Sequence, residues 1–252
     1  MNIEKALENY VLRLADTTMI MGQRLSELCS KGPYLEEDIA ISNIALDYLG
    51  QANSLYIYAS QENKEGKSAD DLAFRRDERY FYNLLIVEQE NGHFGNTIAK
   101  IFCFAAYQEV FYSKLLESNN NQLAAIAEKS LKEVKYHLRH AKSWIIRLGD
   151  GTKESKEKVQ IAINDIWRFT GEFFEMDEID KILLKEGVAI DATKLKKQWD
   201  IIINDCLNEA NLKRPEDSFM MSGGKTGLHS EKLGFILAEM QFLQRAYPDA
   251  KW

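Results

Sequence analysis

Four acidic residues, one on each of four consecutive helix-forming stretches, could together bind a pair of iron ions. They are Asp47, Asp77, Glu109 and Glu133. A carboxylate-bridged di-iron site takes one acid from each of two helices, and from each of two others an acid followed three residues later by a histidine. That spacing places both side chains on one helix face, and their oxygen and nitrogen atoms suit iron. The order of the acids therefore fits such a site.

The histidines that such a site needs are missing. The residues three positions after Asp77, Glu109 and Glu133 are all tyrosines: Tyr80, Tyr112 and Tyr136. Buried acids without a metal repel one another unless they are protonated or paired, and phenol groups can donate hydrogen bonds to them. The pattern indicates a vestigial site that no longer holds metal. Two alternatives stay open: the acids lie on solvated helix faces and never meet, or they bind a metal with ligands from elsewhere.

Two histidines are candidates for such replacement ligands. His137 and His140 follow Glu133 by four and seven residues, so all three share one helix stripe. The alternative is that these histidines pair with nearby acids or are hydrogen-bonded core groups. His93, beside a predicted turn, and His229, before the last predicted helix, are not expected to bind metal. We therefore assign no catalytic, cofactor-binding or metal-binding residue to this chain.

Two other patterns fail as functional motifs. The three cysteines, Cys29, Cys103 and Cys206, are far apart and lack CxxC spacing, so we expect them to be small apolar core residues. The segment Gly224-Lys225-Thr226 resembles the end of a phosphate-binding P-loop. The match fails because Phe219 stands where the first glycine is required and no strand precedes it.

The elements that would position these residues are helices, because the chain has only 3 prolines and little strand-like alternation. Apolar periodicity and breaking residues predict helices over about 3–29, 33–61, 68–88, 94–117, 122–148, 152–170, 177–186, 191–210 and 230–247. The segment 212–228 is expected to be irregular. Ser68 with Asp71 predicts a capping box, and the expected N-caps of later helices are Thr152, Asp177, Asp191 and Ser230.

Long helices joined by short loops are typical of an antiparallel bundle. We predict an all-α protein with one domain over residues 1–252. Its core bundle spans about 33–148, flanked by the N-terminal helix and by additional C-terminal helices. The second predicted helix is apolar on most sides, as a central bundle helix should be; its apolar residues include Ile39, Ile41, Ile44, Leu46, Leu49 and Leu55.

Composition excludes several classes of protein. The 252 residues are 45% hydrophobic and 28% charged, a globular balance rather than a disordered one. The net charge of −7, with no basic stripe evident, argues against nucleic acid as a partner. No stretch is apolar for the roughly 18 residues that a membrane span needs, and Met1 to Asn9 does not resemble a signal peptide. We expect a cytoplasmic protein that binds neither nucleic acid nor membrane.

Several segments together are similar to a known family. They are Leu35-Glu36-Glu37-Asp38-Ile39-Ala40, Asn43-Ile44-Ala45-Leu46-Asp47, Asp70-Asp71-Leu72-Ala73, Arg76-Asp77-Glu78-Arg79, Val87-Glu88-Gln89, Lys132-Glu133-Val134-Lys135-Tyr136-His137-Leu138-Arg139-His140, Arg147-Leu148-Gly149-Asp150-Gly151-Thr152, Phe174-Glu175-Met176-Asp177-Glu178, His229-Ser230-Glu231 and Leu237-Ala238-Glu239-Met240-Gln241, and the final Trp252. Across nearly its whole length, the chain resembles the C subunits of bacterial phenylacetyl-CoA epoxidases, multicomponent oxygenases of aerobic phenylacetate breakdown.

The resemblance implies a ferritin-like fold and a structural role. In that complex the A subunit holds the di-iron centre and the CoA-thioester pocket, and the C subunit shares its fold without being catalytic. A small B subunit and a reductase that takes electrons from NADPH complete the assembly. The implied partners of this chain are the A subunit, the B subunit and, transiently, the reductase; a homodimer is also possible. No cofactor is implied in this chain itself.

The leading hypothesis is therefore a non-catalytic scaffold. An alternative is a di-iron oxygenase in its own right, with the four acids, His137 and His140 as ligands. An iron store of the ferritin type is disfavoured, because the extra helices after Gly149 would hinder closed-shell packing. The ending, residues 223–252, is a candidate contact for the partner, and packing within its own chain is the alternative.

Overall fold

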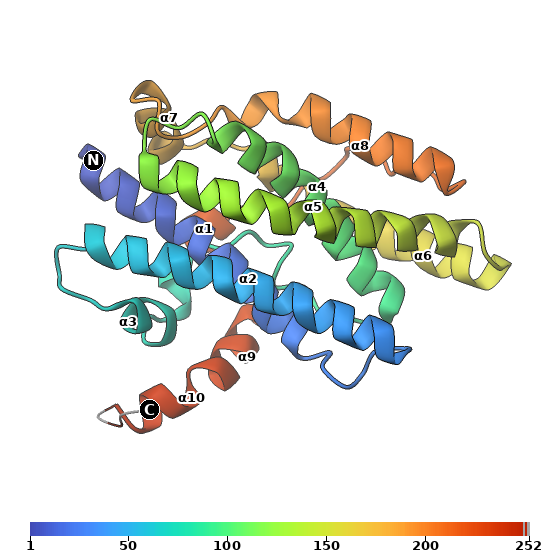
Figure 1. Cartoon of the computed structure of the whole chain (residues 1–252), viewed down its shortest axis with the longest axis horizontal. Coiled ribbons are helices and arrows are strands. Elements are labelled where there is room, and N and C mark those ends of the chain that lie inside the picture. Colours follow the sequence, from blue (N-terminus) through green and yellow to red (C-terminus); the bar gives the residue numbers. More distant parts are fainter. Residues whose placement is uncertain (249, 251–252) are drawn as a thin grey trace. The chain divides into compact units, whose positions relative to one another are not determined.

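The computed structural model describes residues 1–248 and 250, and all regular secondary structure among them is helical. The residues group into two compact units. One consists of residues 1–90 and 222–252, and the other of residues 91–221. In the part of the chain that the structure describes, no helix has both the length and the hydropathy needed to cross a membrane. The order of the helices along the chain can be followed in Figure 1.

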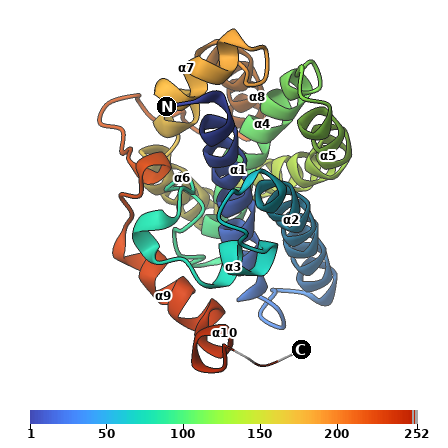
Figure 2. The same cartoon turned by 90° about the vertical axis from the view of Figure 1, so that its left-hand side faces the viewer.

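The first unit is built on two long helices, α1 (Ile3–Ser26) and α2 (Leu35–Glu62). They run antiparallel, side by side (Figures 1 and 2). Both helices bury apolar side chains at three- and four-residue intervals, as the sequence predicts. The core they form includes Val11, Ile20, Leu25, Ile44 and Leu55.

The predicted helix over 68–88 is wrong in length. Ser68 and Asp71 form the predicted capping box, but α3 ends after six residues (Ala69–Phe74). A 3₁₀ turn η1 (Glu78–Tyr80) and an irregular segment to His93 follow.

Side chains of α1 explain why no helix forms there. The backbone amides of Tyr82 and Leu84 donate to Asp16 and to the Thr17 hydroxyl, at 2.9 and 3.2 Å, instead of to helical carbonyls. In addition, residues 83–89 are all buried. An amphipathic helix would bury only the residues of one face and would leave some of these seven exposed.

The C-terminal segment completes the first unit. A 3₁₀ turn η4 (Gly224–Thr226) precedes two short helices, α9 (Glu231–Met240) and α10 (Phe242–Ala246), which follow one another at an angle (Figure 2). The predicted single helix over 230–247 is thus divided at Gln241. The side chain of this buried residue donates to the carbonyls of Ala73 and Arg76 at 3.4 and 3.0 Å.

The second unit is an array of helices around an aromatic core. Its long helices are α4 (Phe94–Leu115) and α5 (Asn121–Gly149), close to their predicted bounds. Thr152 and Asp177 cap the following helices as predicted, and Asp191 caps a 3₁₀ turn in front of α8. The remaining elements are α6 (Lys153–Trp167), η2 (Gly171–Phe174), α7 (Glu178–Lys185), η3 (Ala192–Lys194) and α8 (Lys196–Glu209). The core rings include Phe104, Tyr107, Phe173 and Trp199.

Two expectations about burial need correction. Cys103 and Cys206 are buried as predicted, but Cys29 is exposed because α1 has already ended in a turn before it. The helix α2 does not bury all of its apolar side chains, as a central bundle helix would. Ile39 and Leu46 are 51% and 64% exposed, so one face of α2 is open to solvent.

Candidate functional site

The four acids of the predicted site fall two to each compact unit. Asp47 on α2 and Asp77 belong to the first unit, and Glu109 on α4 and Glu133 on α5 belong to the second. Asp47, Glu109 and Glu133 are half-buried. A site shared by all four acids, and the protonation state of its members, therefore stay predictions.

Asp77 lies in a setting that differs most from the predicted one. It is the residue before the 3₁₀ turn η1 rather than part of a long helix, so Tyr80 does not share a helix face with it. The Asp77 carboxylate is 72% exposed and pairs with Arg245 on α10 at 2.8 Å. Tyr80 is exposed as well. These two residues do not provide a buried acid with a phenol donor.

Of the three tyrosines that stand in place of histidines, only Tyr112 on α4 is buried. Tyr112 hydrogen-bonds with the side chains of Ser130 on α5 and Gln108 on its own helix. Burial raises the pKa of the Tyr112 phenol well above its ordinary value, and the nearby charge of Glu133 raises it further. The phenol therefore stays protonated, and it acts as a hydrogen-bond group beside Glu133.

The two histidines of α5 gather around Tyr136. The ring of His140 stacks on that of Tyr136 with centroids 6.2 Å apart, and the ring of His137 meets it edge-on at 6.3 Å. Arg139 lies over the same tyrosine ring, at 5.6 Å from its centroid. His137 is buried, whereas His140 is half-buried. Both histidines of the predicted stripe therefore contact one aromatic ring, and their role as ligands stays a prediction.

One pair in the sequence has the acid–histidine spacing of an iron ligand set. Glu90 and His93 are three residues apart, but they lie on irregular backbone with Gly92 at φ +58° between them. No helical turn brings them to one face. Glu90 is exposed and pairs with Lys232 at 3.1 Å, and His93 is the exposed N-cap residue of α4.

These surroundings do not fit a di-iron centre. Among the residues that the structure describes, no group of three or more His, Cys, Asp or Glu side chains is arranged to hold a metal ion. Asp77 is paired with an arginine, and tyrosine hydroxyls stand in place of the imidazole ligands that iron needs. No chemical step through iron is derived from this chain.

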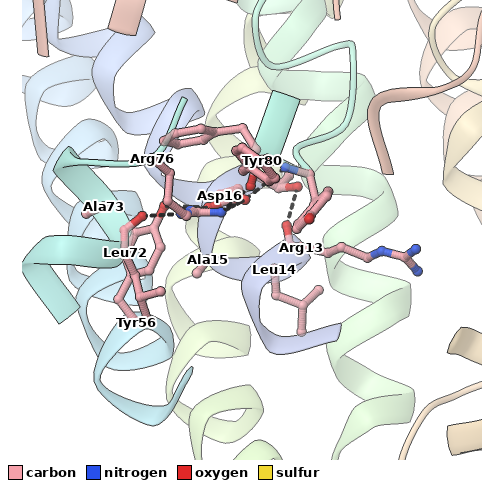
Figure 3. Close-up of polar contacts among 12 residues, drawn as sticks. Arg13, Leu14, Ala15, Asp16, Tyr56, Leu72, Ala73, Arg76 and Tyr80 are labelled. Atoms are coloured by element: carbon pink, nitrogen blue, oxygen red, sulfur yellow. Dashed lines mark hydrogen bonds and ion pairs between the residues drawn. The ribbon is translucent and has the colours of Figure 1, made fainter. Parts of the chain in front are cut away.

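A buried acid that we did not predict is at the centre of the first unit. The side chain of Asp16 on α1 is fully buried, and it pairs with Arg76, which follows α3 (Figure 3). Tyr56 on α2 donates its hydroxyl to Oδ1 of Asp16 at 2.6 Å, and the backbone amide of Tyr82 donates to Oδ2 at 2.9 Å. Each carboxylate oxygen is thereby bound by protein donors.

The guanidinium of Arg76 also has several partners besides Asp16. It donates to the carbonyls of Leu72 and Tyr80 (Figure 3). In addition, it lies over the ring of Phe81 at 4.3 Å from the centroid.

Burial by itself lowers the pKa of Arg76, but the charge of Asp16, the hydrogen bond to it and the nearby Tyr56 and Tyr82 together outweigh burial, and the pKa rises. For Tyr56, burial and Asp16 both raise the pKa. The Arg76 guanidinium stays charged, and both oxygens of Asp16 accept hydrogen bonds, so the pair holds α1, α2 and the segment after α3 together.

A second buried acid fixes the C-terminal segment within the first unit. Glu88 is fully buried, and its Oε1 accepts from the backbone amide of Ser230 at 3.0 Å. Nδ1 of His229 lies 3.3 Å from Oε2 of Glu88, and Nε2 of the same ring lies 2.8 Å from the carbonyl oxygen of Phe81. Because both ring nitrogens lie near acceptor oxygens, these contacts favour the imidazolium, which has two N–H groups, and the pKa of His229 is raised.

Sequence reasoning missed the roles of Asp16, Arg76, Glu88 and His229. A signal existed for Asp16, because it interrupts the apolar face of α1, where an acid requires a partner. No sequence signal points to which cation that partner is.

Part of the ending is packed in its own unit, because Leu233, Ile236 and Leu237 are buried, whereas Phe235 and Phe242 are 70% and 63% exposed. The partner contact predicted for residues 223–252 stays a prediction.

A cavity of about 630 Å³, lined by charged and uncharged side chains, opens in the first unit next to Arg76. Basic and acidic groups line it in equal number, and its cations are paired with acids: Lys5 with Glu8, Lys67 with Glu65, and Arg75 with Asp71. This balance gives the cavity no preference for an anionic or a cationic ligand. The described polar clusters of the first unit therefore serve its packing.

Comparison with known proteins agrees with the resemblance read from the sequence. The model of a family described as phenylacetic acid catabolic protein matches residues 2–252. The chain is 48% identical over 246 residues to the C subunit of 1,2-phenylacetyl-CoA epoxidase from Escherichia coli (strain K12). That match covers 98% of this chain and 99% of the relative. The predicted fold class is confirmed, because the described structure is helical and the family has a ferritin-like helical fold.

Proposed function

The chain belongs to the phenylacetic acid catabolic protein family, and we propose that it is the non-catalytic C subunit of a phenylacetyl-CoA epoxidase. In this role it binds and stabilises a di-iron A subunit in aerobic phenylacetate catabolism. The B subunit and an NADPH-dependent reductase complete the proposed assembly, which we place in the cytoplasm. The 48% identity to the C subunit of the Escherichia coli epoxidase, over nearly the whole of both chains, supports this assignment.

The observation that carries the non-catalytic part is the presence of tyrosine where iron ligation needs histidine. A tyrosine stands three residues after each of three acids, at Tyr80, Tyr112 and Tyr136. A phenol must lose its proton to bind iron strongly, and burial raises the pKa of Tyr112 instead. In our proposal the iron and the electron transfer from NADPH belong to the partner subunits, and this chain has no resident cofactor.

Iron analysis of the purified chain tests this part of the proposal. The chain is produced in iron-supplemented cells and measured by plasma mass spectrometry beside an A subunit prepared in the same way. We expect far less than one iron per chain here, against about two in the A subunit. Two tightly bound irons in this chain, together with oxygen consumption when the reductase is added, would contradict the proposal and favour an independent di-iron oxygenase.

Co-purification tests the scaffold part separately. With an affinity tag on this chain, we expect the A subunit to be retained through washing, because interfaces of permanent complexes are large and apolar. The control is an unrelated tagged helical protein in the same cells. A stable iron-loaded A subunit that is active without this chain would contradict the scaffold role.

A further inference from the structure

The outer face of α2 carries a regular row of uncharged residues. Its members are Ile39, Asn43, Leu46, Gly50, Asn53 and Ile57, and we call this row the seam. They are spaced by four, three, four, three and four residues, which is the spacing of a coiled-coil contact line. The large apolar side chains in it are open to solvent: Ile39 is 51%, Leu46 is 64% and Ile57 is 43% exposed. A helix face of this kind is suited to packing against another helix.

The seam reads nearly the same in both directions. About Tyr48 as centre, Ile39 is the counterpart of Ile57, and Asn43 is the counterpart of Asn53. Two copies of α2 that run antiparallel across a twofold axis would place isoleucine against isoleucine and asparagine against asparagine. A twofold interface requires such self-complementarity, because residue i of one copy contacts residue j of the other and the reverse also holds.

The remaining pair is a large residue opposite a small one. Leu46 of one copy would face Gly50 of the other, and the space above Gly50 is open, since an added Cβ would meet no atom within 4 Å. The Leu46 side chain of each copy would therefore fill the gap above Gly50 of the other copy. This knob and hole bring the two helices close at the centre of the contact.

The charged residues of α2 lie outside the seam. Asp47 lies beside the seam near Tyr48 and is half-buried. The acids near the start of the seam (Glu36, Glu37 and Asp38) would lie opposite the far end of the partner helix. That end carries Tyr58, Ala59, Ser60 and Gln61 before Glu62. Because α2 contains no lysine or arginine, no ion pair forms between two copies of it.

We propose that α2 is the interface of a homodimer, in which the seam packs antiparallel against the seam of a second copy about a twofold axis at Tyr48. This inference rests on the face of α2 alone and does not depend on the proposed function. The two asparagine pairs can hydrogen-bond across the axis and fix the register, as a buried asparagine does in coiled coils.

Mass measurement tests the dimer. The chain has a mass of 29.0 kDa, and light scattering of the purified protein should give twice that value. Leu46→Glu should reduce the mass to that of one copy without loss of helical circular dichroism, because Leu46 is an exposed residue in the single copy. Ile161→Glu is the matched control: Ile161 on α6 is 56% exposed, against 64% for Leu46, and its replacement should leave the dimer intact.

Cysteine cross-linking tests the direction and register. In a Cys29→Ser background, the double variant Asn43→Cys with Asn53→Cys should form a disulfide-linked dimer. Each single variant should not, because equivalent positions 43 in an antiparallel pair lie about 15 Å apart along the axis, beyond the reach of a disulfide. Linking of the Asn43→Cys variant by itself would indicate a parallel pair and overturn the proposal.

Two further results would overturn it. One is a single-copy mass for the unmodified chain at every concentration measured. The other is a Leu46→Glu variant that remains a dimer. If the chain is a single copy and Leu46→Glu abolishes retention of the A subunit, the seam belongs to a different interface, and the homodimer is wrong. That result would leave the proposed scaffold function standing, so the two proposals fail separately.

Discussion

At the scale of single residues, the deeply buried acids of the first unit are used for structure. Asp16 has four protein donors around its two oxygens, and Glu88 accepts from Ser230 and faces His229. A carboxylate that binds iron needs oxygen lone pairs that are free of protein donors. These two acids instead connect segments far apart in the sequence, and removing either partner should be costly.

The Asp16–Arg76 pair gives the first prediction. Asp16→Ala should lower the free energy of unfolding by about 3–5 kcal/mol, because it leaves the Arg76 charge buried without a partner. Urea unfolding followed by circular dichroism measures the change. Asp77→Ala is the control, since its exposed pair with Arg245 should contribute less than about 1 kcal/mol.

A double replacement completes this test. The variant that combines Asp16→Leu with Arg76→Met should recover much of the lost stability, because no buried charge is then left alone. If Asp16→Ala unfolds at the same urea concentration as the unmodified chain, the pair does not hold the first unit together.

The second prediction concerns His229 and pH. Burial by itself lowers the pKa of His229, but its contacts with Glu88 and the carbonyl of Phe81 outweigh burial and raise it above the ordinary value of 6.5. Since the folded protein holds the proton more tightly than the unfolded chain, the stabilisation is complete below pH 6.5. It is lost as the pH rises through the raised value.

Urea unfolding at a series of pH values measures this effect. The stability difference between the unmodified chain and His229→Asn should be largest in mild acid and shrink in mild alkali. In a Glu88→Gln background, the pH dependence should be much weaker, because the carboxylate that favours the imidazolium is absent. A difference that grows with rising pH would show that the histidine is neutral when buried.

At the scale of elements, contact distances decide which helix positions need glycine. The end of α5 approaches the residue after α8 so closely that a Cβ on Gly149 would lie 2.3 Å from the carbonyl oxygen of Ala210. Backbone atoms of that kind do not move aside easily. Gly50, in contrast, faces open space on α2. The two glycines have opposite consequences when replaced.

The third prediction compares these two positions. Gly149→Ala should destabilise the protein by about 1–3 kcal/mol, because the added methyl group forces a shift of packed backbone. Gly50→Ala should stabilise it by up to about 1 kcal/mol, since alanine is the better helix former. Both are measured by urea unfolding in the Leu46→Glu background, so that association does not contribute. Equal effects of the two replacements would contradict the close approach at Ala210.

At the scale of the whole molecule, net charge governs how copies meet. Each chain carries −7, so two copies repel one another at long range. The proposed interface holds no ion pair that salt could weaken, because the seam is uncharged. Salt should therefore act on the repulsion and leave the contact itself unaffected.

The fourth prediction follows from this balance. Raising the salt concentration from about 0.01 to 0.15 M, which shortens the screening length from about 30 to 8 Å, should strengthen dimerisation. Sedimentation equilibrium at the two salt concentrations measures the dissociation constant. Weaker association at the higher concentration would mean that ion pairs hold the copies together, and would argue against the seam as the interface.

Much of the fold could be predicted from the sequence, because local physics decides it. The bounds of α1, α2, α4 and α5 follow from apolar periodicity, and the caps at Ser68, Thr152 and Asp177 follow from side chains that bond within three residues. The tyrosines that replace histidine are visible without any structure. These features depend on residues close together in the chain.

Only the tertiary structure decided what happens after Phe74 and which acids are buried. The helix predicted over 68–88 has good local propensity, but side chains of α1 bind its amides at Tyr82 and Leu84 and hold the segment in an irregular form. Likewise, Asp16 and Glu88 find partners 60 and 142 residues away, at Arg76 and Ser230. Such pairings depend on how distant segments pack, and the free energy of burying a charge is set by that packing rather than by sequence neighbours.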